Sequence, residues 1–226
     1  MSRDKVKWIA TAFMIADHAA YASVFCGIPA LICHIFGKAA APLMFFFVAE
    51  GYGHTKDPEG YVKRLFLLAV ISQIPYAIFI NRGTLFPFHG NVIFTLLLAL
   101  LSIHVYETEE DLIVRWSIIT AFVILSYLSD WGIFGIMICL SFWIFKDRKA
   151  QISMYLFISI IKTAAVYAWY GTGTTFMACA ISPIIVALLI ISYNGKSGKR
   201  HNSLFYAVYP LQFVAFNLFE IIRRGR

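Results

Sequence analysis

Long apolar stretches separated by short polar breaks recur along the whole chain. A bilayer core about 30 Å thick needs roughly 20 apolar residues per helix, and every backbone amide inside it must be bonded within its own segment. The pattern therefore predicts an all-α, polytopic transmembrane helix bundle of about nine spans, within a range of eight to ten. The expected spans cover residues 6–25, 38–54, 61–80, 91–106, 112–128, 132–146, 151–169, 173–193 and 203–222.

One apolar stretch does not fit this series. Residues 27–36 read GIPALICHIF and are too short to cross a bilayer, so we expect an interfacial or re-entrant piece before the span at 38–54. No internal repeat, low-complexity tract or soluble segment interrupts the pattern. We therefore expect residues 1–226 to form a single integral membrane domain.

Composition and charge agree with a membrane protein. Hydrophobic residues make up 60% of the chain and charged residues 14%, against about 25% charged in a soluble domain. The basic segment MSRDKVKW precedes the first span, which predicts a cytoplasmic N-terminus and a multi-pass protein of a bacterial-type inner (plasma) membrane. Alternation then places most other basic loop residues on the same side: Lys56, Lys63, Arg64, Lys146, Arg148, Lys149, Lys196, Lys199 and Arg200.

Two further charge features bear on orientation and partners. The basic tail RRGR does not fit the alternation, because nine spans place it outside. The net charge of +7 follows from the basic loops and their attraction to anionic lipid, so the expected partner is the lipid bilayer and not nucleic acid.

The first apolar stretch contains an Asp-His pair, Asp17 and His18. A charged side chain at the bilayer centre costs about 2.5–3.5 kcal/mol on insertion scales, so such residues either join helices or mark a site. Lys7 precedes His18 by eleven residues. That separation is three helical turns with about 20° of drift and about 16 Å of rise. Both residues therefore share one face, which suits a long ligand with an anionic head, such as an acyl-coenzyme A.

The two residues of this pair have different expected roles. A neutral imidazole can take a proton from an attacking amine or hydroxyl, so His18 is the candidate general base. Asp17 lies about 100° around the helix from His18 and is poorly placed to orient that ring. We expect Asp17 to pair with a cation from another helix.

A second polar group lies at the end of the span at 38–54. Glu50 and His54 are four residues apart and share a helix face. Arg64 begins the next span, close in sequence to Lys56 and Lys63. Such a basic residue either anchors the helix at the interface or binds a phosphate group with its neighbours. The sequence leaves both alternatives open.

The chain resembles the TraX family, whose namesake acetylates the N-terminus of F-pilin. Five blocks carry the resemblance, in the order and approximate spacing of that family: KWIATAFMIADHAA, GKAAAPLMFFFVAEGYGHTKDPEGYVKRLFLLAVISQIPYAIF, NVIFTLLLAL, SDWGIFGIM and YAVYPLQF. The family is also similar to the membrane acyltransferases of family 3, which carry a basic residue, ten intervening residues and a histidine in the first helix. Lys7 and His18 reproduce that spacing, with lysine in place of the more usual arginine.

The resemblance implies an integral membrane acyltransferase with acetyl-coenzyme A as acyl donor and no metal. The implied acceptor is an amine or hydroxyl, with the N-terminus of a pilin-like protein, a peptide or a small molecule as candidates. In this family pattern His18 is the catalytic base and Asp17 supports it. The implied donor-binding residues are Lys7, Lys38, Lys63 and Arg64, and those implied to line the donor or acceptor site are Glu50, His54, Asn91, Thr95, Asp130 and Tyr209.

Two positions depart from the family pattern. The family commonly reads Tyr-Pro-Leu-His near the C-terminus, where this chain has Gln212, a side chain that cannot act as acid or base. Lys38 stands where an arginine is usual, which keeps the charge and loses a bidentate phosphate contact.

Two rival interpretations remain open at the level of sequence. A transporter or proton-coupled carrier would use Asp17, His18, Glu50 and His54 as a relay, although that class predicts internal symmetry and the chain shows none. A noncatalytic scaffold would use the same residues to hold helices together. Within the acyltransferase interpretation, direct attack on the donor needs a single base, whereas the alternative passes through an acetyl-histidine. The four cysteines and the histidines at 34, 89, 104 and 201 lack metal-ligand spacing.

Overall fold

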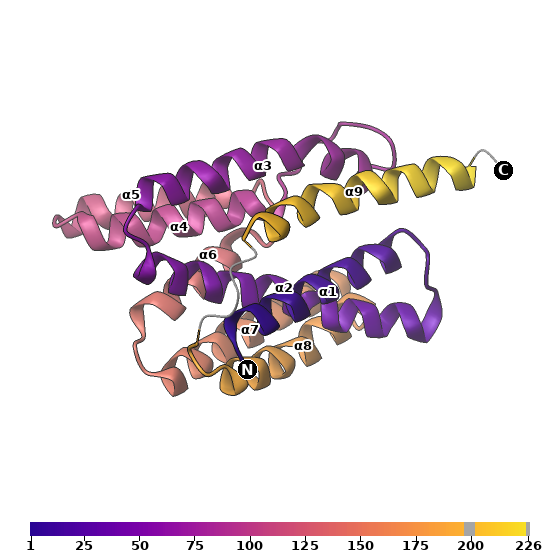
Figure 1. Ribbon diagram of the computed structural model, residues 1–226. Helices are drawn as coiled ribbons and strands as arrows, with labels where there is room; N and C mark the ends of the chain where they lie inside the picture. Colours follow the sequence, from indigo (N-terminus) through magenta and orange to yellow (C-terminus); the bar gives the residue numbers. More distant parts are fainter. Residues whose placement is uncertain (197–201, 225–226) are drawn as a thin grey trace. The chain divides into compact units, whose positions relative to one another are not determined.

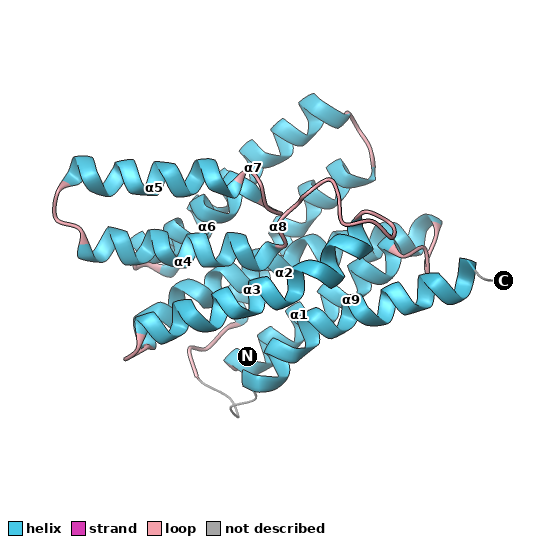
Figure 2. Ribbon diagram, turned by 90° about the horizontal axis from the view of Figure 1, so that it is seen from above, coloured by secondary structure: helices cyan, strands magenta, loops and turns pink. Residues whose placement is uncertain are grey.

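The computed structural model describes residues 1–196 and 202–224, and within these ranges the chain is helical (Figure 1). Apart from an isolated parallel bridge between Gly90 and Ser129, these residues form no strand, as the colouring in Figure 2 shows. The all-α prediction is confirmed. The helices are α1 (Arg3–Tyr21), α2 (Gly27–His54), α3 (Pro58–Ile80), α4 (Val92–Thr108), α5 (Leu112–Ser126), α6 (Gly132–Ile144), α7 (Arg148–Tyr170), α8 (Thr174–Ser192) and α9 (Asn202–Arg224). Lys199, Arg200, His201 and the end of the RRGR tail lie outside the described residues.

Side-chain caps fix where four of these helices begin. Asp57 accepts a hydrogen bond from the Gly60 amide at 2.8 Å, and Pro58 occupies the first position of α3. Asn91, Asp111 and Asp147 cap α4, α5 and α7 in the same way. Each cap satisfies an amide that has no partner inside its helix, so these polar residues set the boundaries of the apolar segments.

The prediction of a separate interfacial or re-entrant piece at residues 27–36 is wrong. Residues 27–54 form one continuous helix, α2, which passes through Gly37 and Pro42. The chain turns earlier, at Ser23 and Gly27, both of which have positive φ angles. Gly37 is not a break in the helix, because its missing Cβ serves close packing against α1.

Five helices are long and apolar enough to cross a membrane by length and composition: α2, α3, α7, α8 and residues 205–223 of α9. The apolar helices α4, α5 and α6 have 17, 15 and 13 residues, shorter than the roughly 20 that a perpendicular span needs. Helix α1 carries five charged residues and is too polar to join the first group. A multi-pass helical architecture follows, while the count of nine spans remains a prediction.

The chain divides into two compact units. Unit 1 comprises Met1–Met44 and Phe145–Phe205, and unit 2 comprises Phe45–Ile144 and Tyr206–Arg226. Helices α2 and α9 contribute residues to both units.

In unit 1, helix α7 packs along α8, and α1 is fixed at its start to the segment that follows α8. The Thr163 hydroxyl donates to the Cys179 carbonyl at 3.1 Å across the α7–α8 interface. The Arg3 amide donates to the Lys196 carbonyl at 3.0 Å, and the Asn194 amide donates to the Met1 carbonyl at 3.0 Å. These backbone bonds hold the N-terminal residues in place.

In unit 2, helix α4 packs against α3, α5 and α6. Phe45, Leu100, Ile136 and Phe213 are fully buried in the core of this unit. A Cβ at Gly135 would lie 2.5 Å from both Phe45 Cζ and Thr95 Cγ2, so only glycine permits α6 to approach this closely.

Candidate functional site

A carboxylate–imidazole pair joins α1 to α2 inside unit 1. Asp17 Oδ1 lies 2.7 Å from His34 Nδ1, and the two side chains are 20% and 25% exposed, so the pair is mostly removed from solvent. Because a carboxylate only accepts, the bond assigns the proton to Nδ1 of His34. The other ring nitrogen, Nε2, has no hydrogen-bond partner among the residues that the structure describes.

The other predicted residues of this region also belong to unit 1. His18 is half-buried in the last turn of α1, one residue beyond Asp17. Lys7 lies at the start of the same helix with its Nζ 5.8 Å from the centre of the Phe205 ring. Lys38 is half-buried on α2, four residues after His34 and hence on the same helix face.

The sequence predicts that Asp17 pairs with a cation from another helix, and the structure joins its carboxylate to His34 on α2. The observed partner is an imidazole and not a lysine or arginine. The family resemblance implies that Asp17 supports His18. The structure shows no hydrogen bond between these two side chains. The carboxylate faces α2, and the His18 side chain leaves α1 about 100° around the helix from it.

Unit 2 has a second polar cluster where α2 and α6 end beside the last turn of α4. The Tyr52 hydroxyl and His104 Nδ1 share a hydrogen bond of 3.0 Å. The Trp143 indole donates to Glu107 Oε1 at 2.6 Å, and its ring meets that of Tyr52 edge to face at 5.1 Å. Ring packing and hydrogen bonds therefore hold four side chains from three helices together.

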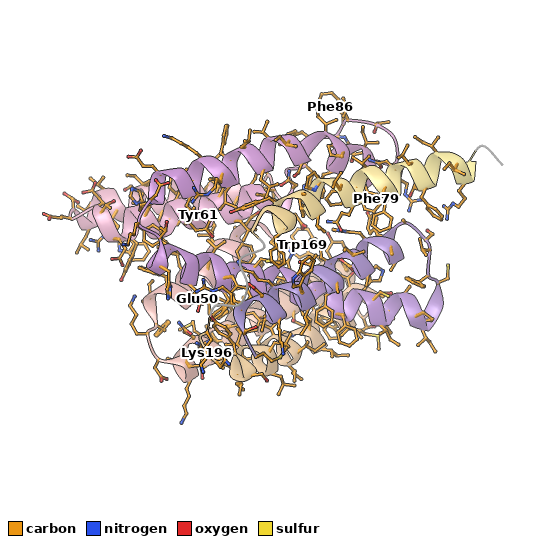
Figure 3. The ribbon with its side chains drawn as sticks, in the orientation of Figure 1. Glu50, Tyr61, Phe79, Phe86, Trp169 and Lys196 are labelled. Atoms are coloured by element: carbon orange, nitrogen blue, oxygen red, sulfur yellow. The ribbon has the colours of Figure 1, made fainter. Side chains whose placement is uncertain are left out.

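Glu50 and His54 lie on the same turn of α2 as Tyr52. His54 is exposed, and its Nδ1 donates to the backbone carbonyl of Glu50 at 2.8 Å. Glu50 is half-buried and Tyr61 lies at the start of the next helix; both are labelled in Figure 3. The predicted pair is thus adjacent in space, with one imidazole nitrogen of His54 committed to its own helix.

Lys63 and Arg64 lie on the first turns of α3. Lys63 Nζ is 3.9 Å from Glu59 Oε2, with both side chains at least 80% exposed. Arg64 lies 3.6 Å from Asp57 Oδ2 and 6.0 Å from the Tyr61 ring centre. An anionic ligand would compete with these carboxylates, and exposed ion pairs are weak enough to exchange.

The predicted residues Asn91 and Thr95 lie in a different setting, fully buried in unit 2. Asn91 Nδ2 donates to the Ala69 carbonyl at 2.9 Å and to Gln73 Oε1 at 3.0 Å, and its Oδ1 caps α4 through the Ile93 amide at 3.0 Å. Gln73 in turn donates to the His89 carbonyl at 2.8 Å. All hydrogen-bonding groups of the Asn91 side chain are therefore used within the protein.

Thr95 and Asp130 belong to the same network. The Thr95 hydroxyl contacts Ser129 Oγ at 2.7 Å and donates to the Asp130 carbonyl. The Asp130 amide donates to the Gly90 carbonyl at 2.8 Å, and its carboxylate accepts from the Trp131 amide at 2.9 Å. Tyr209 is buried beside the start of α4, close to Asp130 and to the Val92 backbone.

Several residues of these sites were not selected from the sequence. His34 was assigned to a short separate piece, but its spacing to Lys38 fits one continuous helix face. His104 and Glu107 lie one turn apart on α4.

No group of three or more His, Cys, Asp or Glu side chains within the described part of the chain could hold a metal ion.

The fold and these sites define a helical protein of the membrane type with a carboxylate–imidazole pair between two helices. The chain belongs to the TraX protein family, whose model matches residues 2–220. It is 28% identical over 221 residues to a protein described as "Probable fimbrial assembly protein FimC, serogroup H1" from Dichelobacter nodosus, an alignment that covers 92% of this chain and 91% of that protein. No solved structure matches the chain. The family resemblance inferred from the sequence is confirmed.

Proposed function

We propose that this protein is an integral membrane acyltransferase that moves an acetyl group from acetyl-coenzyme A to an amine or hydroxyl acceptor. Membership of the TraX family carries the proposal, because that family is linked to the acetylation of F-pilin. The D. nodosus relative, described as a probable fimbrial assembly protein, makes the N-terminus of a pilin-like protein the first acceptor to test.

The residues of unit 1 supply what acyl transfer needs. An acceptor attacks the thioester carbonyl and must lose a proton, which an imidazole accepts at neutral pH. His18 and His34 both lie beside Asp17, in the helix pair α1–α2. Lys7 and Lys38 place positive charge on the same two helices, suited to the phosphates of the donor. With the N-terminus in the cytoplasm, the donor enters from the side on which coenzyme A is made.

Residues of unit 2 are proposed to contact the substrates. Glu50 and His54 lie at the end of α2, and Lys63 and Arg64 lie on the first turns of α3, which follows it in the chain. These four residues are proposed to contact donor or acceptor, while Asn91, Thr95, Asp130 and Tyr209 line the interior of the same unit. The reaction is direct transfer, which needs one base and no covalent enzyme intermediate.

Acetyl transfer by purified protein tests the proposal. The parent protein in detergent is mixed with acetyl-coenzyme A and a peptide with a free N-terminal amine, and thiol release is followed together with acetylation of the peptide by mass spectrometry. We expect both signals from the parent and a loss of about 10²–10⁴-fold in the double variant His18→Ala/His34→Ala.

His89→Ala is the matched control, because His89 lies in the loop before α4 and its backbone carbonyl, not its ring, bonds to Gln73. Well-folded parent protein that neither binds acetyl-coenzyme A nor releases thiol would refute the proposal. That result would favour the carrier interpretation.

A further inference from the structure

Asp17 is held in a fixed position by the packing of α1 against α2. A Cβ at Gly37 would overlap Asp17 Cβ and Cγ, so the aspartate side chain lies directly on the glycine backbone. Phe13 and Phe36 pack nearby with ring centres 4.8 Å apart. Gly37 therefore creates the space in which this carboxylate sits, and the helix contact limits its movement.

The fixed carboxylate orients His34. Asp17 Oδ1 and His34 Nδ1 are 2.7 Å apart, a short charge-assisted distance. The bond leaves Nε2 unprotonated in the neutral ring, with its lone pair directed away from Asp17. His34 is 25% exposed and Nε2 has no partner among the described residues, so a substrate group can reach it. A carboxylate on one imidazole nitrogen and a reactive nitrogen opposite is the arrangement of a general base in hydrolytic triads.

The same geometry distinguishes His34 from His18. Asp17 and His18 are consecutive in α1, so their side chains leave the helix about 100° apart. The direction in which Asp17 reaches α2 is the direction of His34. Of the two histidines, the one that Asp17 orients is therefore His34 on α2, 16 residues after His18 in the chain.

We propose that His34 is a catalytic residue of the acyl transfer and that Asp17 is its positioning residue; this rests on the proposed function. The acceptor amine attacks the thioester carbonyl carbon and forms the C–N bond while the carbonyl electron pair moves to oxygen. His34 Nε2 takes one proton from the amine, and Asp17 stabilises the resulting imidazolium. The intermediate then collapses, the C–S bond breaks, and the coenzyme A thiolate leaves with the electron pair and receives the proton from His34.

Single variants separate the two histidines. We expect His34→Gln to lower kcat by about 10²–10⁴-fold with little change in KM for acetyl-coenzyme A, because a base is lost and not a binding contact. His18→Gln is the matched comparison and is expected to lower kcat less. Added imidazole is expected to restore part of the activity of His34→Ala, which a purely structural role for the ring would not allow.

Asp17 and Gly37 provide readouts of positioning. We expect Asp17→Asn to lower kcat while KM stays constant, and Gly37→Ala to do the same by displacing the carboxylate. Gly173→Ala is the matched glycine control, since a Cβ there meets nothing within 4 Å. In ¹⁵N-histidine NMR of the purified protein, the parent should show a ring protonated at Nδ1 with a downfield proton, besides the Nδ1-protonated ring of His54, and Asp17→Asn should remove the first of these signals and keep the second.

The outcomes also distinguish this inference from the proposed function. Parent-level kcat in His34→Gln, with activity abolished in His18→Gln, would overturn the role of His34 and leave the acetyltransferase intact. Parent protein with the NMR signature but no acetyl transfer would overturn the proposed function and this inference with it. Loss of kcat in His34→Gln, with imidazole rescue of His34→Ala, would support both.

Discussion

The Asp17–His34 pair and the network around Asn91 both place polar side chains inside apolar helices, but they differ in what is left unbonded. Asn91 is fully buried, and both of its Nδ2 protons and its Oδ1 are bonded to other parts of unit 2. In unit 1 the His34 ring has one nitrogen bonded to Asp17 and one without a partner among the described residues.

This difference separates structure from chemistry. A buried amide with every group bonded gains stability from those bonds and has nothing to offer a substrate. A half-buried imidazole with one oriented nitrogen and one open nitrogen gives up part of that stability and keeps a basic site. Variants at the two places should therefore change different measured quantities.

The largest effect on stability is expected at Asn91. Asn91→Ala removes the cap of α4, so the Ile93 amide loses its partner, and it removes one hydrogen bond each from the Ala69 carbonyl and from Gln73 Oε1, which keeps its bond to the backbone amide of residue 91. The loss of a cap costs about 1 kcal/mol and each of the two other buried hydrogen bonds about 0.5–1.5 kcal/mol, so we expect unfolding to become easier by about 2–4 kcal/mol. Unfolding of the purified protein in an SDS titration measures this.

Asn81→Ala is the control for this variant, since Asn81 bonds to the Pro87 carbonyl in an exposed loop and should cost far less. If Asn91 instead bound the acyl carbonyl of the donor, Asn91→Ala would raise KM for acetyl-coenzyme A and leave unfolding unchanged. That pattern would remove the contrast between the two regions.

A smaller loss is expected at Thr95, one turn further along α4. Thr95→Val keeps the shape of the side chain and removes a hydroxyl that bonds to Ser129 and to the Asp130 carbonyl. The substitution removes both bonds and leaves the Asp130 carbonyl without this buried donor, which costs about 1–3 kcal/mol. Thr108→Val, whose hydroxyl bonds only to its own helix at an exposed position, is the control. Equal unfolding midpoints for the two variants would contradict a structural role for Thr95.

Much of the fold could be predicted from the sequence, because the length of each apolar segment and the polar residues at its ends can be read locally. Asp57, Asn91, Asp111 and Asp147 each mark the start of a helix, and the observed helices begin at those caps. The boundary between Gly37 and Lys38 could not be read correctly, because glycine signals both a helix end and close helix packing. Only the position of Asp17 against Gly37 decides between the two.

The candidate site was predictable only in part, and for the same reason. Asp17 and His18 attract notice as charged residues in an apolar span, which is a property of one segment. The partner of Asp17 depends on how α1 crosses α2, and His34 has no local signal of that crossing. Likewise, the bonding of Asn91 and Thr95 depends on residues 69, 73, 129 and 130, which the sequence does not place beside them.

The Tyr52–His104 pair lies between the two extremes and should show a moderate effect. Its hydroxyl bonds to an imidazole in a half-buried setting where water can replace part of the bond. We expect Tyr52→Phe to lower the free energy of unfolding by about 0.5–1.5 kcal/mol. Tyr127→Phe, at a position 77% exposed, is the matched control. A change as large as that of Asn91→Ala would show that this pair is part of the folded core.

The smallest effect on stability is expected at Lys63, and it tests the comparison from the exposed side. Its amine is 3.9 Å from Glu59, and both side chains are at least 80% exposed, so water and salt already screen the pair. We expect Lys63→Ala to change the free energy of unfolding by less than about 0.5 kcal/mol.

If Lys63 contacts the donor phosphates as proposed, the KM of the Lys63→Ala variant for acetyl-coenzyme A should exceed the parent value at low ionic strength and approach it as salt is added. Glu59→Gln removes the competing carboxylate and should lower that KM. A KM that neither substitution moves would exclude Lys63 from donor binding, because an exposed charge with so weak a partner has no structural contact that could mask the loss.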